Sequence, residues 1–166
     1  MFDAPFVLFD EDQRTIEKIL EQLVQEAHAT SAFVIDKAGP LIAQSGSLVG
    51  IDTTGLASLT AGAIAATGGL AHLIGEDEFP THTHQGIHRH VQMTLVGTRS
   101  ILVVVFDDKS TLGLVKLRSR KAGARLATFF NDVHSRTGPT GNARGPFADL
   151  TDADLDHLFI ETAPED

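Results

Sequence analysis

The sequence predicts an α/β domain with the element order α-β-β-α-β-β-β-α, in which a five-stranded, mainly antiparallel sheet lies between layers of helices. Three observations carry this prediction. Apolar residues recur at helical spacing in three segments, and short turn sequences join most of the strand-like segments between them. Residues 101–106, ILVVVF, are apolar at every position, so a strand there needs helices over both faces of the sheet.

The chain is expected to begin with a helix over residues 10–28. Its apolar stripe consists of Ile16, Ile19, Leu20, Leu23, Val24 and Ala27. Asp10 and Gln13 have the spacing of a capping box at its start. Residues 32–36 and 41–45 follow as two strands, and the turn sequence DKAGP between them offers Gly39 for a positive φ.

A second helix is expected over residues 52–74, with Asp52 or Thr53 as its cap. Its two sides differ in side-chain size rather than in polarity. One side is expected to be an ordinary core seam and consists of Leu56, Leu59, Ala63, Ala66, Leu70 and Leu73. The other side consists of Ser58, Ala61, Ala65, Gly69 and His72. It offers almost no side chain, so another structure can approach the backbone closely.

Three glycines lie within this helical pattern, at Gly62, Gly68 and Gly69. Glycine inside a helix costs about 1 kcal/mol relative to alanine. Such a cost indicates contact with a partner, and tight packing inside the fold is the alternative explanation.

The rest of the sheet is expected from three closely spaced strands over residues 87–96, 100–106 and 111–118. The sequences GTR and DDKS lie between these strands and are expected to form hairpin loops. A third helix follows over residues 120–135, marked by Leu126, Phe129, Phe130 and Val133.

The composition then changes, which divides the chain into a domain at 1–136, a flexible linker rich in Gly and Pro at 137–149, and a short helix and tail at 150–166. In the tail, Leu155, Leu158 and Phe159 form a small apolar patch. A helix this short is marginal alone, so we expect it to dock on the domain or on a partner.

Composition excludes several classes of protein. The 166 residues carry a formal net charge of -9, which argues against a nucleic-acid binder. The absence of cysteine excludes disulfides, thiol nucleophiles and thiolate metal sites. Neither a signal peptide nor an apolar run of about 18 residues is visible, so we expect a cytoplasmic protein without a membrane span.

Candidate chemistry is sparse. His82, His84, His88 and His90 lie close together, but no established metal pattern includes them, and we expect a solvated loop followed by a strand rim rather than a metal site. A metal-binding module built on these histidines remains the weaker rival. The chain has no phosphate-binding glycine motif and no supported catalytic serine, so we expect no catalytic residues and no cofactor. Seven arginines are each conceivable as fingers supplied to a GTPase, but a surface arginine is far more often a solvated charge; they are Arg89, Arg99, Arg118, Arg120, Arg125, Arg136 and Arg144.

The helix at 52–74 and its flanks carry a specific resemblance. The stretches LASLTAG at 56–62, GGLA at 68–71, LIGE at 73–76 and EFP at 78–80, with TLGLV at 111–115, resemble the roadblock family of longin-like modules that sit on Ras-like GTPases and motors. The resemblance covers residues 6–160, and within the family it is tightest to the bacterial regulators of cell polarity and gliding motility. The histidine-rich stretch at 81–90 departs from the family pattern.

This resemblance implies a homodimer that binds an MglA-like small GTPase in its GTP form and stimulates GTP hydrolysis by remodelling the GTPase's own catalytic residues. It implies a regulator rather than an enzyme, located in the cytoplasm or at a cell pole. The alternative is a scaffold that binds the GTPase without accelerating hydrolysis. The strand at 87–96 and the helix at 52–74 are expected to form the dimer interface. The residues expected to bind the GTPase are Ala61, Ala65, Gly68, Gly69 and His72, with the tail docking elsewhere on it through Leu155, Leu158 and Phe159.

Overall fold

The computed structural model describes residues 7–137, and residues 7–133 belong to one compact unit. The elements along the chain are α1 (Asp10–Ala27), β1 (Ser31–Asp36), β2 (Leu41–Gly46), α2 (Thr53–Leu73), β3 (Thr81–Gln85), β4 (His90–Val96), β5 (Ser100–Phe106) and α3 (Leu112–Thr137). The predicted element order is therefore confirmed.

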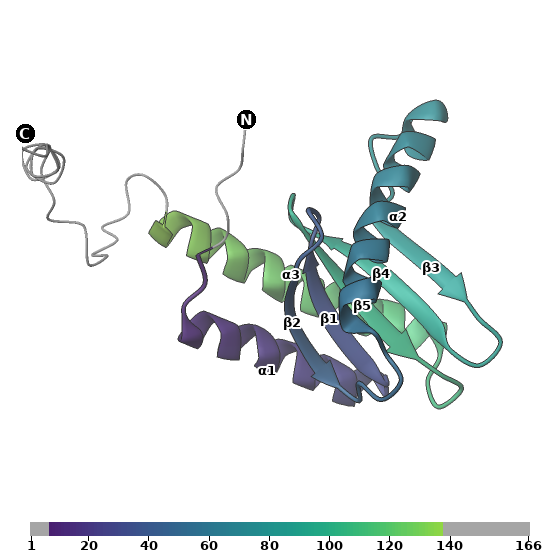
Figure 1. Cartoon of the computed structure of the whole chain (residues 1–166), viewed down its shortest axis with the longest axis horizontal. Helices are drawn as coiled ribbons and strands as arrows, with labels where there is room; N and C mark the ends of the chain where they lie inside the picture. The colour runs from purple at the N-terminus through teal and green to yellow at the C-terminus, as the bar shows by residue number, and fades with distance from the viewer. Residues whose placement is uncertain (1–6, 138–166) are drawn as a thin grey trace, which may run out of the picture. The chain divides into compact units, whose positions relative to one another are not determined.

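The five strands form one open sheet in the order β2-β1-β5-β4-β3, and every pair of neighbours is antiparallel. Helices α1 and α3 cover one face of the sheet, and α2 crosses the other (Figure 1). The two edge strands are β2, which α1 contacts, and β3.

Strand β5 explains why both faces are covered. Leu102, Val104 and Phe106 belong to the apolar cluster under α1 and α3. Ile101, Val103 and Val105 alternate with them and belong to the cluster under α2. Since side chains of a strand alternate between the two faces, an entirely apolar strand is stable only with cover on each. The prediction drawn from 101–106 is confirmed.

The predicted strand at 111–118 is wrong, because these residues form the first two turns of α3. The hydroxyl of Thr111 accepts a hydrogen bond from the backbone N–H of Leu114, and the N–H of Val115 donates to the carbonyl of Thr111. Val115 and Ser119, one helical turn apart, are buried together. The apolar residues of TLGLV allow either period, and packing under the sheet selected the helix.

The missing strand lies at Thr81–Gln85, which the sequence predicted as a loop. The strand predicted at 87–96 begins only at His90, because the N–H of Gly86 donates to the carbonyl of Arg89 and closes a turn there. Polar side chains hide this strand, since THTHQ has no apolar alternation.

The caps of the first two helices show one correction and one confirmation. At α1 the carboxylate of Asp12 accepts from the N–H of Phe9, so the cap lies one residue earlier than the predicted pair of Asp10 and Gln13. Gln13 instead donates its amide to the carbonyl of Ile42 in β2. At α2 Asp52 caps the helix as predicted.

Packing of α3 under the sheet gives a stability prediction. Leu126 is fully buried, whereas Leu117 on the same helix is 60% exposed. Leu126→Ala should lower the free energy of unfolding by about 2–5 kcal/mol, because it leaves a cavity in the core. Leu117→Ala should change it by less than about 0.5 kcal/mol, because it removes little buried surface. Urea denaturation of both variants checks this, and equal losses would contradict the assigned face of α3.

Candidate functional site

The buried residues on the sheet-facing side of α2 have small side chains. They are Ala57, Thr60, Ala61 and Ala71. Leu56 and Ile64 pack partly against the same cluster beside Phe33 and Met93 of the sheet. Short side chains let the helix backbone approach the sheet closely, and this closeness decides which side of α2 is inside.

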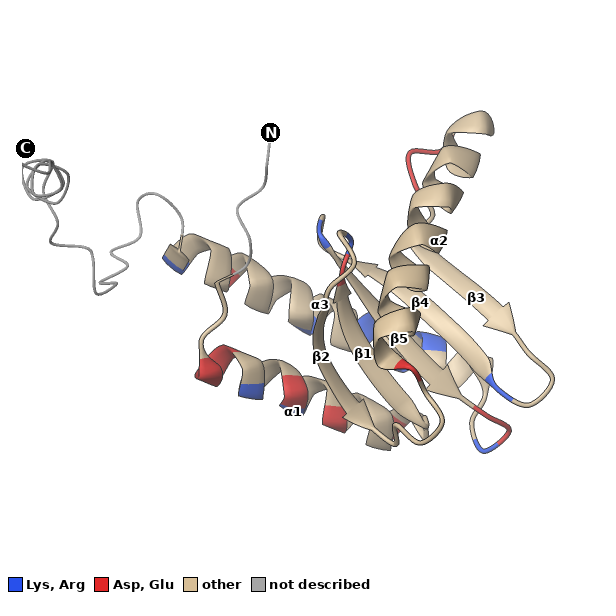
Figure 2. Cartoon of the chain, in the orientation of Figure 1, with Lys and Arg blue, Asp and Glu red and all other residues tan. Residues whose placement is uncertain are grey.

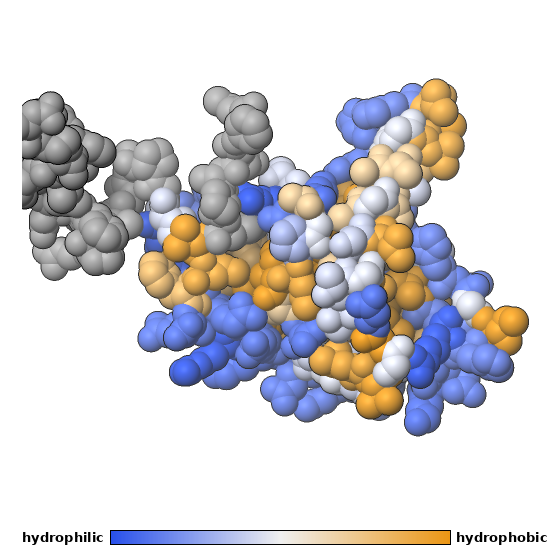
Figure 3. Space-filling model, viewed as in Figure 1, coloured by the Kyte–Doolittle hydropathy of each residue, from blue (hydrophilic) through white to orange (hydrophobic). Residues whose placement is uncertain are grey.

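The predicted core seam of α2 is therefore wrong. Leu59 is 76% exposed, Leu70 52% and Leu73 83%, and Ala66 is exposed too. Of the predicted seam, Leu56 and Ala63 are the half-buried members. Hydropathy alone cannot separate a helix side buried in the protomer from an apolar side available to a partner. Figure 3 shows the apolar surface running to the end of α2.

The glycines of α2 are not explained by packing within the protomer. A Cβ atom added at Gly62, Gly68 or Gly69 would meet nothing within 4 Å. At Gly55, by contrast, it would lie 2.5 Å from the capping carboxylate of Asp52. Among the described residues, tight packing inside the fold therefore does not explain these three glycines. No contact within the protomer offsets the helix stability that they lose relative to alanine.

The five residues predicted to bind the GTPase do not all share one environment. Ala65, Gly69 and His72 are exposed, and Gly68 is half-buried. Ala61 lies against the sheet and is 9% exposed. The structure therefore brings Ala65, Gly69 and His72 together on one accessible flank of α2 and turns Ala61 inward.

Helix α2 carries no Lys, Arg, Asp or Glu, and Figure 2 shows charge only at its ends. Among the described helices it is the one whose length and hydropathy would suffice to cross a membrane. Only 28% of that apolar window is buried in the protomer, although the helix packs on the sheet. A large exposed apolar surface of this kind marks a contact with another molecule.

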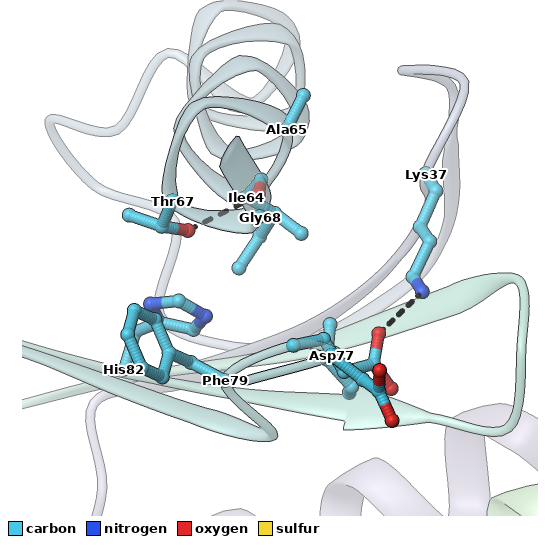
Figure 4. A pocket seen from close by; sticks show the side chains of 10 residues that line it. Lys37, Ile64, Ala65, Thr67, Gly68, Asp77, Phe79 and His82 are labelled. Carbon is cyan, nitrogen blue, oxygen red and sulfur yellow. Dashed lines mark hydrogen bonds and ion pairs between the residues drawn. The ribbon is translucent and has the colours of Figure 1, made fainter. Parts of the chain in front are cut away.

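A hollow of about 210 Å³ lies between α2 and the β3 side of the sheet (Figure 4). Thr67 points from the helix toward Phe79 and His82, while Ala65 lies on the side of Lys37 (Figure 4). Lys37 pairs with Glu78 at 3.6 Å across its rim. Two flanks of α2 therefore line this hollow, one through Thr67 toward β3 and one through Ala65 toward the β1–β2 turn.

His82 faces this hollow. Its ring packs edge-on against Phe79, with 6.0 Å between ring centroids. Burial lowers the pKa of His82, a hydrogen bond to the backbone of Phe79 raises it, and the nearby His84 lowers it further. The neutral imidazole is therefore favoured.

The histidines lie differently from the prediction. His82 and His84 belong to strand β3, whereas His88 lies in the turn and His90 begins β4. Within residues 7–137 of one protomer, no group of three or more His, Cys, Asp or Glu side chains could hold a metal ion. Because THTHQ lacks a strand signal, the sequence missed that β3 is an exposed edge.

Two arginines considered as fingers hold structural ion pairs. Arg99 contacts the buried Asp36 at 3.0 Å, and its carbonyl accepts from the N–H of Lys37, which ties two turns at one end of the sheet. Arg118 pairs with Glu26 at 3.1 Å. The predicted docking residues of the tail, Leu155, Leu158 and Phe159, lie outside the described residues, as does nearly all of the predicted linker.

Comparisons with known proteins agree with one another. The Roadblock/LC7 domain model matches residues 15–106. MglB from Myxococcus xanthus is 46% identical with a TM-score of 0.72, and the match covers 76% of this chain and 96% of that one. The gliding protein MglB from Thermus thermophilus is 32% identical with a TM-score of 0.72, and the match covers 79% of this chain and 99% of that one. An MglB with a tetrameric arrangement is 31% identical with a TM-score of 0.73, and the match covers 80% of this chain and 99% of that one. No curated protein sequence matches the chain significantly.

The open space around the helix glycines gives a second prediction. Gly69→Ala should raise the free energy of unfolding by up to about 1 kcal/mol, because the methyl group improves helix propensity and meets nothing. Gly46→Ala should lower it, because Gly46 has φ 92° and its Cβ would lie 2.5 Å from the carbonyl of Thr30. Thermal melting at one protein concentration compares them. Destabilisation by Gly69→Ala would show that this flank is packed inside the domain.

Proposed function

The chain belongs to the Roadblock/LC7 family, and from that premise we propose that it is a homodimeric GTPase-activating protein for an MglA-like Ras-family GTPase in its GTP form. Its relatives are regulatory domains, and we assign no catalytic residues to the chain itself. The proposed process is the control of cell polarity and gliding motility, in the cytoplasm and at a cell pole.

The surface of α2 carries this proposal. It combines exposed leucines, an exposed flank of Ala65, Gly69 and His72, and glycines that packing within the protomer does not require. An uncharged helix with such a surface fits close contact with other proteins. The chain is similar to two MglB proteins, at 46% and 32% identity over nearly their whole lengths. This similarity is our reason for proposing an MglA-like GTPase as the partner.

Self-association is supported on the β3 side of the domain. Within residues 7–137, strand β3 leaves one edge of the sheet unpaired, and an unpaired edge is a template for another strand. The strand predicted at 87–96, which the sequence placed in the interface, corresponds to β4. It cannot pair with a strand of a second copy, because β4 is already paired with β3 and β5. We therefore move the proposed interface to Thr81–Gln85 of β3 and keep α2 as its second component.

The two flanks of α2 divide the proposed roles. At about 100° per residue, Leu70 lies about 60° from Thr67, on the flank toward β3, and about 140° from Ala65. We assign Leu59 and Leu70 to the dimer seam. Ala65 lies on the flank toward the β1–β2 turn (Figure 4). Gly69 and His72 lie within about 40° of Ala65 around the helix, and all three are exposed and accessible for the GTPase.

Acceleration of hydrolysis is proposed to come from repositioning the GTPase's own catalytic residues. The ion pairs of Arg99 with Asp36 and of Arg118 with Glu26 occupy two side chains that a finger mechanism would need free. The alternative is a scaffold that binds the GTPase without accelerating hydrolysis. Single-turnover phosphate release, measured beside binding, separates the two.

The dimer seam is tested by a matched pair of leucines. Leu70 is 52% exposed on α2 and Leu117 is 60% exposed on α3. Leu70→Asp should give a folded monomer, because a charge would be buried in the seam. Leu117→Asp should leave a dimer, because its surface stays in water. Light scattering and circular dichroism check both variants. A monomer mass for the unmodified chain at micromolar concentration would refute the dimer.

The GTPase surface is tested by enlarging the small flank. Ala65→Arg and Gly69→Arg should abolish GTPase binding and activation while the dimer persists, because the bulky side chain blocks approach of the GTPase. Gly69→Ala should be much milder. Stimulated GTP hydrolysis is measured beside thermal melting for each variant. A folded Ala65→Arg dimer that activates the GTPase fully would place the contact elsewhere.

A further inference from the structure

The edge strand β3 presents a pair of histidines on one face. His82 lies opposite Met93 of β4, and His84 lies opposite Val91. Met93 and Val91 belong to the apolar cluster under α2, so His82 and His84 point to the α2 side of the sheet. Thr83 between them points to the other side, where its hydroxyl bonds the buried Gln92 at 2.6 Å.

A pair of β3 edges brings these histidines together. We infer this from the proposed homodimer, on which the argument rests. If the α2 helices of both protomers share the seam, they lie on the same side of the extended sheet, and the two-fold axis is perpendicular to it. The axis then passes between the two copies of one β3 residue, so that residue lies opposite itself and each even-numbered residue lies opposite an even-numbered one.

Registers centred on these residues make histidines neighbours, and the one centred on Thr83 brings all four together. With the axis at Thr83, each His82 lies opposite the His84 of the other copy. With the axis at His82 or at His84, that residue lies opposite itself. Directly opposite Cβ atoms are about 4.5–5.5 Å apart and diagonal ones about 7–8 Å, within reach of a shared ion.

We propose that paired β3 strands form a site for a divalent transition-metal ion such as Zn²⁺, with His82 and His84 of each protomer as its ligands. Imidazole nitrogen is a preferred ligand of such ions. One protomer supplies two of the four histidines, so the site is complete only in the dimer.

The surroundings of His82 suit a ligand. The ring is half-buried, packs edge-on against Phe79 and faces the hollow beside β3. Asp77, Glu78 and Lys37 line the same hollow. Because Lys37 pairs with Glu78, Asp77 is the lining carboxylate whose charge favours a cation there. Bound metal would join the two edges and stabilise the dimer by linkage.

The test titrates the full chain, stripped with EDTA, with ZnCl₂ and measures metal binding and the dimer dissociation constant. We expect one Zn²⁺ per two protomers and a tighter dimer with Zn²⁺ but not with Mg²⁺. His84→Gln, at an exposed position, should weaken Zn²⁺ binding by about tenfold or more, and His82→Gln should do the same. His88→Gln, in the exposed turn, is the matched control and should bind as the unmodified chain does.

The outcomes separate this site from the proposed dimer. A dimer in EDTA that binds no Zn²⁺, or whose Zn²⁺ binding His84→Gln leaves unchanged, overturns the metal site alone. One Zn²⁺ per protomer without tightening of the dimer also overturns it. A monomer mass with and without Zn²⁺ overturns both the shared site and the dimer.

Discussion

The burial of β5 on both faces is the constraint on which the rest of the structure depends. Residues alternating along this strand belong to two separate apolar clusters, and each cluster needs its own cover. Helices α1 and α3 together cover one face. On the other face α2 packs over the sheet, with alanine and threonine as its buried residues and Leu56 and Ile64 half-buried beside them. Because a single helix is narrower than a five-stranded sheet, part of the sheet beside β3 remains open.

This unequal cover accounts for the candidate surfaces. The small side chains that seat α2 on the sheet leave its leucines outside, and its glycines border open space. The open strip beside α2 contains the hollow with His82 and ends at the unpaired edge of β3. The two proposed contacts, with a second copy and with a GTPase, follow from opposite flanks of one helix. The histidine pair is a local addition to that arrangement, placed by the register of β3 against β4.

Some of the architecture was readable from the sequence because it rests on local or strongly patterned signals. The stripe of α1, the Asp52 cap, the Gly39 turn and the apolar run of β5 predicted their elements and the two-faced cover of the sheet. The size asymmetry of α2 likewise indicated an interacting helix, since the cost of internal glycines is a local property.

The tertiary structure alone decided the remaining points. TLGLV at 111–115 fits a strand or a helix by its own pattern, and packing under the sheet made it helix. THTHQ has no strand signal, and pairing with β4 made it strand. The sequence assigned Leu59, Leu70 and Leu73 to the core, but closeness to the sheet favoured the alanine side of α2 and left them exposed. The physical reason is common to all three cases. Hydrophobicity and periodicity show that a side chain can be buried, while only the neighbouring backbone determines which side is buried, and whether it is buried within the protomer or against a partner.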